Sequence, residues 1–391
     1  MSAADLIVPA DVIIHSARLV SDGTTTADSW VAFTGDTITS RGTGTGWQAF
    51  LDTQTAVTDA AGRRLTPGFI DIHCHGGGGA AFDLGASEIA TGLAVHHRHG
   101  TTRAVLSLVT ASQADLEKRV AVIADSAEQN PLVLGAHLEG PFLDTEFRGA
   151  HDPELLRAPD ALSISRLLAA GRGQIRQITL APELPGALNA IRQFTEAGVA
   201  VAIGHSATDY ESALAAFDAG ASILTHAFNG MRGIHHRAPG PVAAATRSAH
   251  VILEVINDGV HVHPEVVRLA FAGAPGRIAL ITDAMAATGA ADGAYILGTL
   301  PVTVTGGVAR LTEGGSIAGS TLTMDVALRR AVTVCGLSVE EAVAALTATP
   351  ARAIGRSHDL GALTVGYAAD AVLLSDTFEV DAVFAAGRRL V

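Results

Sequence analysis

The segment from Gly68 to His75 reads Gly-Phe-Ile-Asp-Ile-His-Cys-His and joins an apolar run to two histidines one residue apart. The run is typical of a buried β-strand, and the glycines at 76–79 mark its end. Side chains i and i+2 of a strand point to the same side. We therefore expect His73 and His75 to face one point in space, where they could bind one metal ion.

Further apolar runs of similar length follow, separated by segments with helical periodicity. The runs cover residues 69–73, 103–109, 132–138, 175–181, 199–205, 222–228, 251–257 and 277–283. The helical segments include 87–98, 112–128, 160–171, 186–197 and 209–219. Eight β/α units are typical of a TIM-like (β/α)8 barrel, so we predict an α/β protein of this class.

Both ends of the chain have the texture of β-structure. Strands are expected at 12–14, 17–20 and 30–33, and again at 361–363, 371–374 and 383–384. We expect the two termini to combine into one small β-sandwich domain, residues 1–65 plus 350–391, beside a catalytic barrel over residues 66–349. Within the latter, a strand-rich insertion over 294–311 is followed by helices over 321–334 and 338–347.

Composition narrows the class of function. The 391 residues are 48% hydrophobic and 17% charged, with a net charge of -13. An acidic chain without basic clusters argues against nucleic acid or an anionic membrane as partner. No apolar stretch is long enough for a transmembrane helix, and the first residues lack the pattern of a secretory signal. With only two cysteines, Cys74 and Cys335, we expect a cytoplasmic protein without disulfides.

Residues that can bind metal follow several of the predicted strands. They are His73 and His75 after the first run, Glu139 after the third, His205 after the fifth, His226 after the sixth and Asp283 after the eighth. The C-terminal ends of barrel strands converge on the catalytic face. The sequence therefore predicts that these side chains meet there in a metal centre.

This donor set suits two cation positions. One would be formed by His73, His75 and Asp283, and the other by His205 and His226. The bridge between them would be a carboxylate and not a carboxylated lysine, because the only lysine, Lys118, lies in a predicted helix. Glu139 is the candidate. Imidazole and carboxylate ligands favour zinc, with iron or manganese as alternatives, and we expect one or two divalent ions per subunit.

Such a centre suits hydrolysis. A bound cation lowers the pKa of its water and so supplies hydroxide near neutral pH. Asp283 would then take the proton of the water and pass it to a leaving group. The reaction expected from these residues is hydrolysis at a carbonyl carbon.

The motifs resemble a known family. The string Pro-Gly-Phe-Ile-Asp-x-His-x-His at 67–75 is similar to that of the amidohydrolase superfamily. Within it, the chain resembles the N-acetylglucosamine-6-phosphate deacetylases at 137–142, 149–151, 204–206, 225–229 and 318–324. The resemblance implies deacetylation of N-acetyl-D-glucosamine 6-phosphate to D-glucosamine 6-phosphate and acetate. The alternative is another N-acetyl amino-sugar phosphate, or a different amidohydrolase reaction on an unphosphorylated amide.

The resemblance also implies roles for individual residues. Glu139, His205 and His226 would be the principal metal ligands, Asp283 the catalytic acid and base, and His151 the histidine near the acetamido carbonyl. Substrate contacts are implied for Ala150, His151, Asn229, Gly230, Arg237, His261, Ile317, Ala318 and Gly319. Some members have Gln and Asn in place of the first two histidines and keep one metal, so the pair in this chain favours two ions.

The predicted binding of a phosphate group depends mainly on Arg237. An acidic protein repels a phosphomonoester at long range, so local cations must compensate, and a guanidinium can bind phosphate oxygens in bidentate fashion. In the family this arginine can come from the neighbouring subunit, which implies a homodimer and leaves open which subunit Arg237 serves. Asp258 is placed to orient His261.

Overall fold

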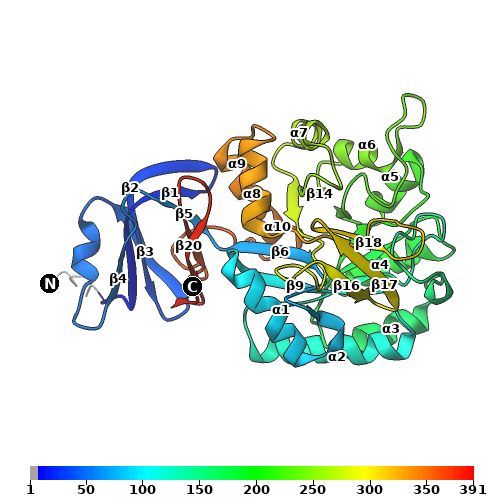
Figure 1. Ribbon diagram of the computed structural model, residues 1–391, viewed down its shortest axis with the longest axis horizontal. Helices are drawn as coiled ribbons and strands as arrows, with labels where there is room; N and C mark the ends of the chain where they lie inside the picture. The colour runs from blue at the N-terminus through cyan, green and yellow to red at the C-terminus, as the bar shows by residue number, and fades with distance from the viewer. Residues whose placement is uncertain (1–7) are drawn as a thin grey trace.

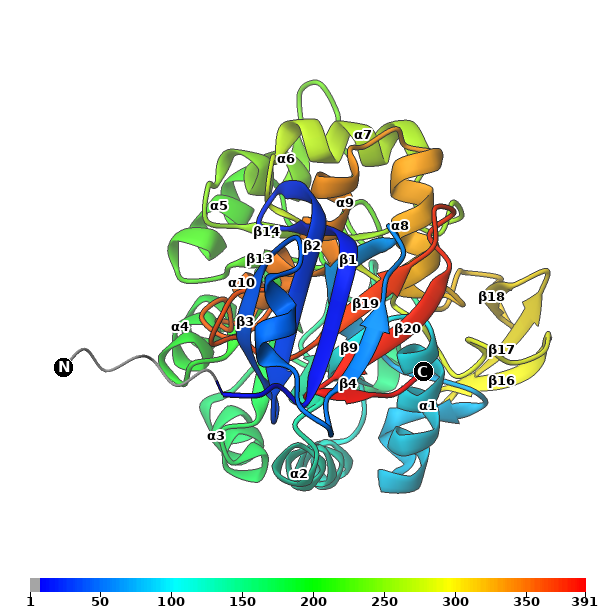
Figure 2. The same cartoon turned by 90° about the vertical axis from the view of Figure 1, so that its left-hand side faces the viewer.

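The computed structural model describes residues 8–391, which form two parts lying side by side (Figure 1). The smaller part is a β-domain that contains both the first and the last described strands. The larger part is a barrel of strands surrounded by helices, and Figure 2 shows the β-domain in front of it. The predicted fold class is confirmed, whereas the residue boundaries of the two domains stay a prediction.

One mixed sheet forms the β-domain. Its strands are β1 (Val12–Ser21), β2 (Thr24–Thr34), β3 (Thr37–Thr43), β4 (Ala56–Asp59), β5 (Arg64–Pro67), β19 (Ala371–Leu374), β20 (Val380–Ala385) and β21 (Arg388–Arg389). Their order is β21-β20-β19-β5-β1-β2-β3, with β4 paired to β1. Strands from the two ends of the chain meet where β5 pairs with β19.

The structure corrects two strand predictions for this domain. The strands predicted at 12–14 and 17–20 are one strand, β1, which continues through a bulge at Ser16, whose φ is 55°. Before the bulge β1 pairs with β4, and after it with β5. Residues 361–363 form no strand, because the N–H of Leu363 donates to Ser21 Oγ instead of to a neighbouring strand.

The sheet of the β-domain folds back on itself. Phe33 of β2 and Phe384 of β20 pack with ring centroids 6.2 Å apart, although three strands separate theirs in the sheet. The N–H of Ile38 also donates to the carbonyl of Tyr367 at 2.9 Å. Both halves of the sheet share one buried apolar core, as the predicted sandwich requires.

Eight parallel strands form the barrel in chain order. They are β6 (Phe69–Cys74), β9 (Thr101–Val109), β10 (Val133–Glu139), β11 (Ile175–Leu180), β12 (Ala200–Ile203), β13 (Ile223–Leu224), β14 (Ile252–Ile256) and β15 (Ile278–Ile281). The surrounding helices are α1 (Ala86–Arg98), α2 (Gln113–Gln129), α3 (Ala161–Gly171), α4 (Ala187–Glu196), α5 (Tyr210–Asp218), α6 (Gly240–Arg247), α7 (Pro264–Gly273) and α8 (Met324–Thr333). Each strand and helix predicted for the barrel is present, with its ends shifted by a few residues.

Shorter elements complete the chain. They are β7 (Gly76–Gly77), β8 (Ala80–Ala81), the meander β16 (Gly293–Leu297), β17 (Leu300–Thr305) and β18 (Val308–Leu311), the helices α9 (Val339–Leu346) and α10 (Ala348–Ala353), and 3-10 turns at 46–50, 82–84 and 153–155. The meander shares an apolar cluster with Val109, Met285 and Ala318, and so packs onto the end of the barrel that bears the site. Within residues 8–391, no helix is long and apolar enough to cross a membrane.

Capping residues explain where several helices begin. Ser112 accepts a hydrogen bond from the backbone N–H of Asp115 at the start of α2, and Asp160 and Asp209 cap α3 and α5 in the same way. At α9, Ser338 and Glu341 form a reciprocal capping box. These local signals fix the helix starts, and hence the loops that carry polar residues to the barrel mouth.

A buried ion pair joins the barrel to the β-domain. Arg103 of β9 donates from Nε to Asp370 Oδ2 at 2.6 Å and from Nη2 to Asp370 Oδ1 at 3.1 Å. Asp370 Oδ1 also accepts the backbone N–H of Ala386 at 2.7 Å. The paired side chains are only 6% and 9% exposed, so each charge depends on the other.

We predict that Asp370→Ala lowers the free energy of unfolding by about 3–5 kcal/mol, because it leaves the Arg103 guanidinium buried without its partner. Urea denaturation followed by circular dichroism measures this. Asp376→Ala is the control: it breaks the pairs of Arg18 and Arg64 with an aspartate whose side chain is 78% exposed, and should barely move the midpoint. Equal midpoints for the two variants would contradict the prediction.

Candidate active site

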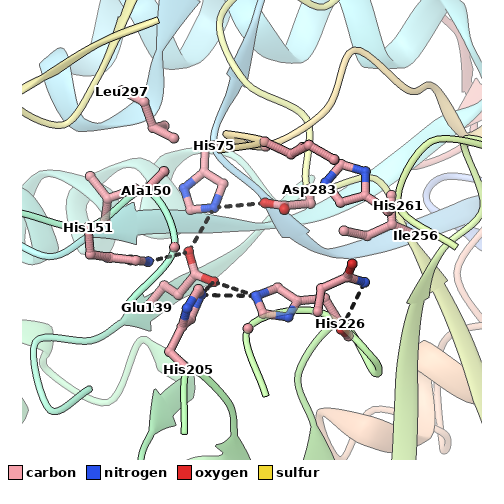
Figure 3. Close-up of a pocket in the computed structure, with 16 residues that line it drawn as sticks. His75, Glu139, Ala150, His151, His205, His226, Ile256, His261, Asp283 and Leu297 are labelled. Carbon is pink, nitrogen blue, oxygen red and sulfur yellow. Dashed lines mark hydrogen bonds and ion pairs between the residues drawn. The ribbon is translucent and has the colours of Figure 1, made fainter. Parts of the chain in front are cut away.

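A cavity of about 160 Å³ opens at the C-terminal ends of the barrel strands (Figure 3). The predicted residues that line it are His75, Glu139, Ala150, His151, His205, His226, Asn229, Gly230, His261, Asp283, Ile317 and Gly319. His73 lies buried directly beneath, in contact with His75. Side chains spread over more than two hundred positions therefore meet at one face, as the barrel prediction requires.

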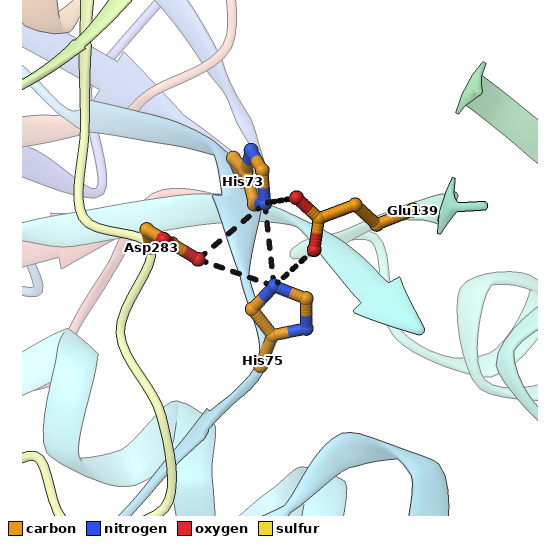
Figure 4. Close-up of side chains that lie close together, drawn as sticks. All are labelled: His73, His75, Glu139 and Asp283. Atoms are coloured by element: carbon orange, nitrogen blue, oxygen red, sulfur yellow. Dashed lines mark hydrogen bonds and ion pairs between the residues drawn. The ribbon is translucent and has the colours of Figure 1, made fainter. Parts of the chain in front are cut away.

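The first group of donors comes from β6 and the two segments that face it (Figure 4). His73 Nε2 and His75 Nε2 lie 3.2 Å apart, so alternation along β6 does bring both rings to one point. Asp283 Oδ1 is 3.2 Å from His75 Nε2 and 3.5 Å from His73 Nε2. Glu139 reaches the same two rings, at 3.2 Å from His75 and 3.4 Å from His73.

The second group shares Glu139 with the first. Glu139 Oε1 lies 3.1 Å from both His205 Nε2 and His226 Nε2, and those two nitrogens are 3.0 Å apart. The bond from His205 Nδ1 to the carbonyl of Phe147, 2.9 Å, turns the other ring nitrogen toward Glu139. One carboxylate thus touches two sets of imidazoles, which is the arrangement that a bridging ligand needs.

Three of these donors have a strained backbone conformation. His205, His226 and Asp283 have φ values of 47°, 24° and 49°, in or beside the left-handed region that non-glycine residues rarely adopt. Each follows the end of a short barrel strand and lines the cavity. Strain of this kind is typical of functional sites.

Glycine makes room beside His205. A Cβ on Gly230 would lie 3.0 Å from His205 Nδ1, and the φ of 59° at Gly230 also favours glycine. The loop after β13 can therefore approach the ring closely. This brings the backbone of Gly230 and the side chain of Asn229 to the cavity wall.

The comparisons with known proteins agree with this geometry. The model of the amidohydrolase family matches residues 64–390. The chain belongs to the amidohydrolase family. It is 40% identical to N-acetylgalactosamine-6-phosphate deacetylase from Escherichia coli O157:H7, over 85% of this chain and 89% of that protein. It is 38% identical to N-acetylglucosamine-6-phosphate deacetylase from Vibrio furnissii, over 83% and 82% of the two chains.

A solved structure is similar over almost the whole length of this amidohydrolase. It is a mutant of N-acetyl-D-glucosamine-6-phosphate deacetylase from Mycobacterium smegmatis in complex with N-acetyl-D-glucosamine-6-phosphate. The TM-score is 0.92 at 41% identity, covering 98% of this chain and 100% of that one. The similarity includes both the barrel and the β-domain.

The donor set of this amidohydrolase fits a divalent cation. Two nitrogens bound to one zinc at about 2.0 Å in tetrahedral geometry would lie about 3.3 Å apart, close to the 3.0 and 3.2 Å between the paired Nε2 atoms. Within the described part of the chain, Nδ1 of His75 and of His226 is buried without a hydrogen-bond partner. The Nε2 atoms that converge on the carboxylates can offer their lone pairs to a cation, which supports a divalent metal centre.

The electrostatics of the cluster are set by its carboxylates. Burial alone would lower the pKa of His75, but its hydrogen bonds to Asp283 and Glu139 prevail and raise that pKa to about 9. Burial would raise the pKa of Asp283, but the charge of His73 and the hydrogen bond with His75 lower it to about 2. The carboxylate therefore stays ionised at neutral pH, ready to bind a cation or accept a proton.

His151 lines the cavity on the side away from His261 (Figure 3). Its Nδ1 is 2.9 Å from Thr110 Oγ1, and its Nε2 lies 3.5 Å from Glu139 Oε2 (Figure 3). Burial and the nearby His205 outweigh Glu139 and lower the pKa of His151 to about 4, so its ring is neutral. A neutral imidazole held in this position can form a hydrogen bond with a carbonyl group near the donor cluster.

Two predicted substrate contacts lie away from the cavity. Arg237 is on the exposed loop between β13 and α6 and contacts the adjacent His236 at 2.7 Å, and Ala318 is buried behind its neighbours Ile317 and Gly319. His261 does line the cavity, and Asp258 Oδ2 lies 2.7 Å from its Nδ1. The predicted contact between Asp258 and His261 is confirmed.

Sequence reasoning missed part of the site. Val109, Ile256 and Leu297 form apolar wall, and nothing in their local sequence distinguishes them from core residues. Glu254, in the middle of apolar β14, is fully buried and contacts His73. A carboxylate inside an apolar run was the available signal, because such a group is rarely buried unless it is paired.

We predict that zinc binding weakens as the pH falls below about 9. At lower pH the His75 ring carries a proton that a cation must displace, so the apparent dissociation constant should rise by up to about tenfold per pH unit for each proton displaced. Competition with a chromophoric chelator at several pH values measures this. An affinity that does not change with pH would contradict the prediction.

Proposed function

We propose that this amidohydrolase removes the acetyl group from N-acetyl-D-glucosamine 6-phosphate, giving D-glucosamine 6-phosphate and acetate. The observation that carries the proposal is the carboxylate of Glu139, which joins two groups of imidazoles with Asp283 beside them. Similarity to deacetylases of phosphorylated amino sugars over more than four-fifths of the chain supports the substrate class.

The metal centre would hold two divalent ions, with zinc the first candidate and iron or manganese the alternatives. His73, His75 and Asp283 would hold one ion, His205 and His226 the other, and Glu139 would bridge. When bound, such ions polarise a carbonyl group and lower the pKa of water.

Asp283 would move the proton. Its carboxylate is ionised, 8% exposed and at the cavity wall, so it can take the proton of the attacking water and then give it to the amide nitrogen as the C–N bond breaks. The acetamide carbonyl oxygen would accept a hydrogen bond from His151 on the opposite wall. Breakdown of the tetrahedral intermediate then yields acetate and the free amine.

The phosphate would bind at the wall formed by Asn229, Gly230 and His261. These groups offer an amide, a backbone N–H and an imidazole held by Asp258, but no permanent cation. We propose a homodimer in which Arg237 of the partner subunit supplies the missing charge, because Arg237 lies on the exposed part of its loop and does not line the cavity of its own chain. We also propose a cytoplasmic location.

A second substrate is favoured by one observation. The relative that is 40% identical carries the name of an N-acetylgalactosamine-6-phosphate deacetylase, and that sugar differs only in the configuration at C4. Acetate release from both phosphosugars, assayed with the same preparation, distinguishes the two candidates. Release from neither would overturn the proposed function.

We predict that Asp283→Asn lowers kcat by about 10²–10⁴-fold, because the amide cannot accept the proton of the water. Its oxygen can still face a cation, so the metal content should stay close to that of the unchanged protein. Acetate release and elemental analysis of one preparation measure both. Retained turnover in the variant would remove Asp283 from the proton-transfer role.

We predict that Arg237→Ala raises KM for the phosphosugar by roughly 10- to 100-fold, because a charge-assisted hydrogen bond to phosphate is lost. Arg232→Ala, on the same exposed loop, is the matched control and should change KM little. Steady-state kinetics with the phosphorylated and unphosphorylated sugars measure the difference, which should appear only with the former. An unchanged KM would refute the phosphate contact.

Mixing subunits tests which chain Arg237 serves. In a mixed dimer of Arg237→Ala and Asp283→Asn subunits, one active site would combine an intact Asp283 with Arg237 of the partner subunit. Activity at low substrate concentration should therefore return upon mixing. No recovery in a sample shown to contain mixed dimers would place Arg237 in its own subunit.

A further inference from the structure

Glu254 lies on the inner face of β14, fully buried below the cavity floor. Its Oε2 is 3.1 Å from Nδ1 of His73 and accepts the backbone N–H of His226 at 3.3 Å. Its Oε1 accepts the side-chain amide of Gln177 at 2.7 Å. Both carboxylate oxygens are therefore satisfied by His73, His226 and Gln177, and Glu254 itself does not line the cavity.

The bond to Glu254 determines which nitrogen of His73 is available to a cation. A carboxylate can only accept, so Nδ1 of His73 carries a hydrogen and Nε2 is left for the ion. Figure 4 shows Nε2 turned toward Glu139 and Asp283 and the other ring nitrogen turned away from them. Glu254 thus fixes both the tautomer and the orientation of this ring.

No other histidine of the centre has such a partner among residues 8–391. His205 is held by a backbone carbonyl, and Nδ1 of His75 and of His226 has no hydrogen-bond partner. The ion position formed by His73, His75 and Asp283 therefore contains a ring that a carboxylate orients, whereas the other position contains none. A carboxylate behind that ring also raises its basicity and adds negative charge next to the cation.

We infer that Glu254 is the positioning residue that controls occupancy of the ion position formed by His73, His75 and Asp283. This inference rests on the metal centre of the proposed function. Because the backbone N–H of His226 needs only an acceptor, replacement of Glu254 should affect the second position, formed by Glu139, His205 and His226, much less.

Two variants of Glu254 separate charge from contact. Glu254→Gln keeps the shape and removes the charge, whereas Glu254→Asp keeps the charge and shortens the reach to His73. Asp71→Asn is the matched control. Asp71 is also a buried carboxylate beside His73, but it accepts the backbone N–H of His73 at 3.2 Å and the hydroxyl of Thr282 at 2.5 Å, not the ring.

The experiment removes metal from each purified full-length protein with a chelator and titrates Co²⁺ back. The number of ions per chain, the dissociation constant of each and the visible absorption of bound cobalt are recorded, and circular dichroism confirms the fold. We expect two ions in the unchanged protein and in Asp71→Asn. In both Glu254 variants one of the two sites, which we assign to His73, His75 and Asp283, should lose about 10- to 100-fold in affinity while the other site is kept.

Three results would overturn the inference. They are unchanged binding in both folded Glu254 variants, equal losses in Asp71→Asn and Glu254→Gln, and a single ion per chain in the unchanged protein. If one Glu254 variant does not fold, the other still decides. Because cobalt binding is read without substrate, failure of the proposed function would appear separately, as absence of acetate release from a protein that binds its ions normally.

Discussion

Backbone hydrogen bonds between the ends of the first and last barrel strands close the barrel and build the active site at the same time. The N–H of Asp283 donates to the carbonyl of His73 at 2.9 Å, and the N–H of His75 donates to the carbonyl of Ala284 at 2.8 Å. The last barrel strand is thereby joined to the first, and the acid of the site is brought beside its two histidines. The chemistry depends on this closure, because no local segment could bring Asp283 and His75 together.

The site concentrates charge that a folded protein would otherwise avoid. Glu139, Glu254 and Asp283 are carboxylates with little or no exposure to solvent, and each is surrounded by imidazoles or amides. Buried carboxylates are unfavourable unless they are paired, and divalent cations would compensate them further. Stability and activity therefore rest on the same groups, together with the strained backbone at His205, His226 and Asp283.

Much of this arrangement could be predicted from the sequence, because its signals are local. The alternation in His73-Cys74-His75, the apolar runs with helices between them, and a polar residue after each of several runs were enough for the barrel and the two donor groups. The bulge in β1 and the positive φ values were not predictable, since they are imposed by tertiary packing. Two further features could not be predicted. The position of Arg237 outside the cavity of its own chain depends on loop conformation. The contact between Glu254 and His73 depends on strand register.

The central claim is that Glu139 lies between two metal ions. Anomalous diffraction at the zinc edge, from crystals of the zinc-loaded protein, tests it most directly. The account predicts two peaks, one beside His73, His75 and Asp283 and one beside His205 and His226, each within bonding distance of a Glu139 oxygen. A map in which Glu139 contacts no ion, or in which the ions lie elsewhere, would contradict it.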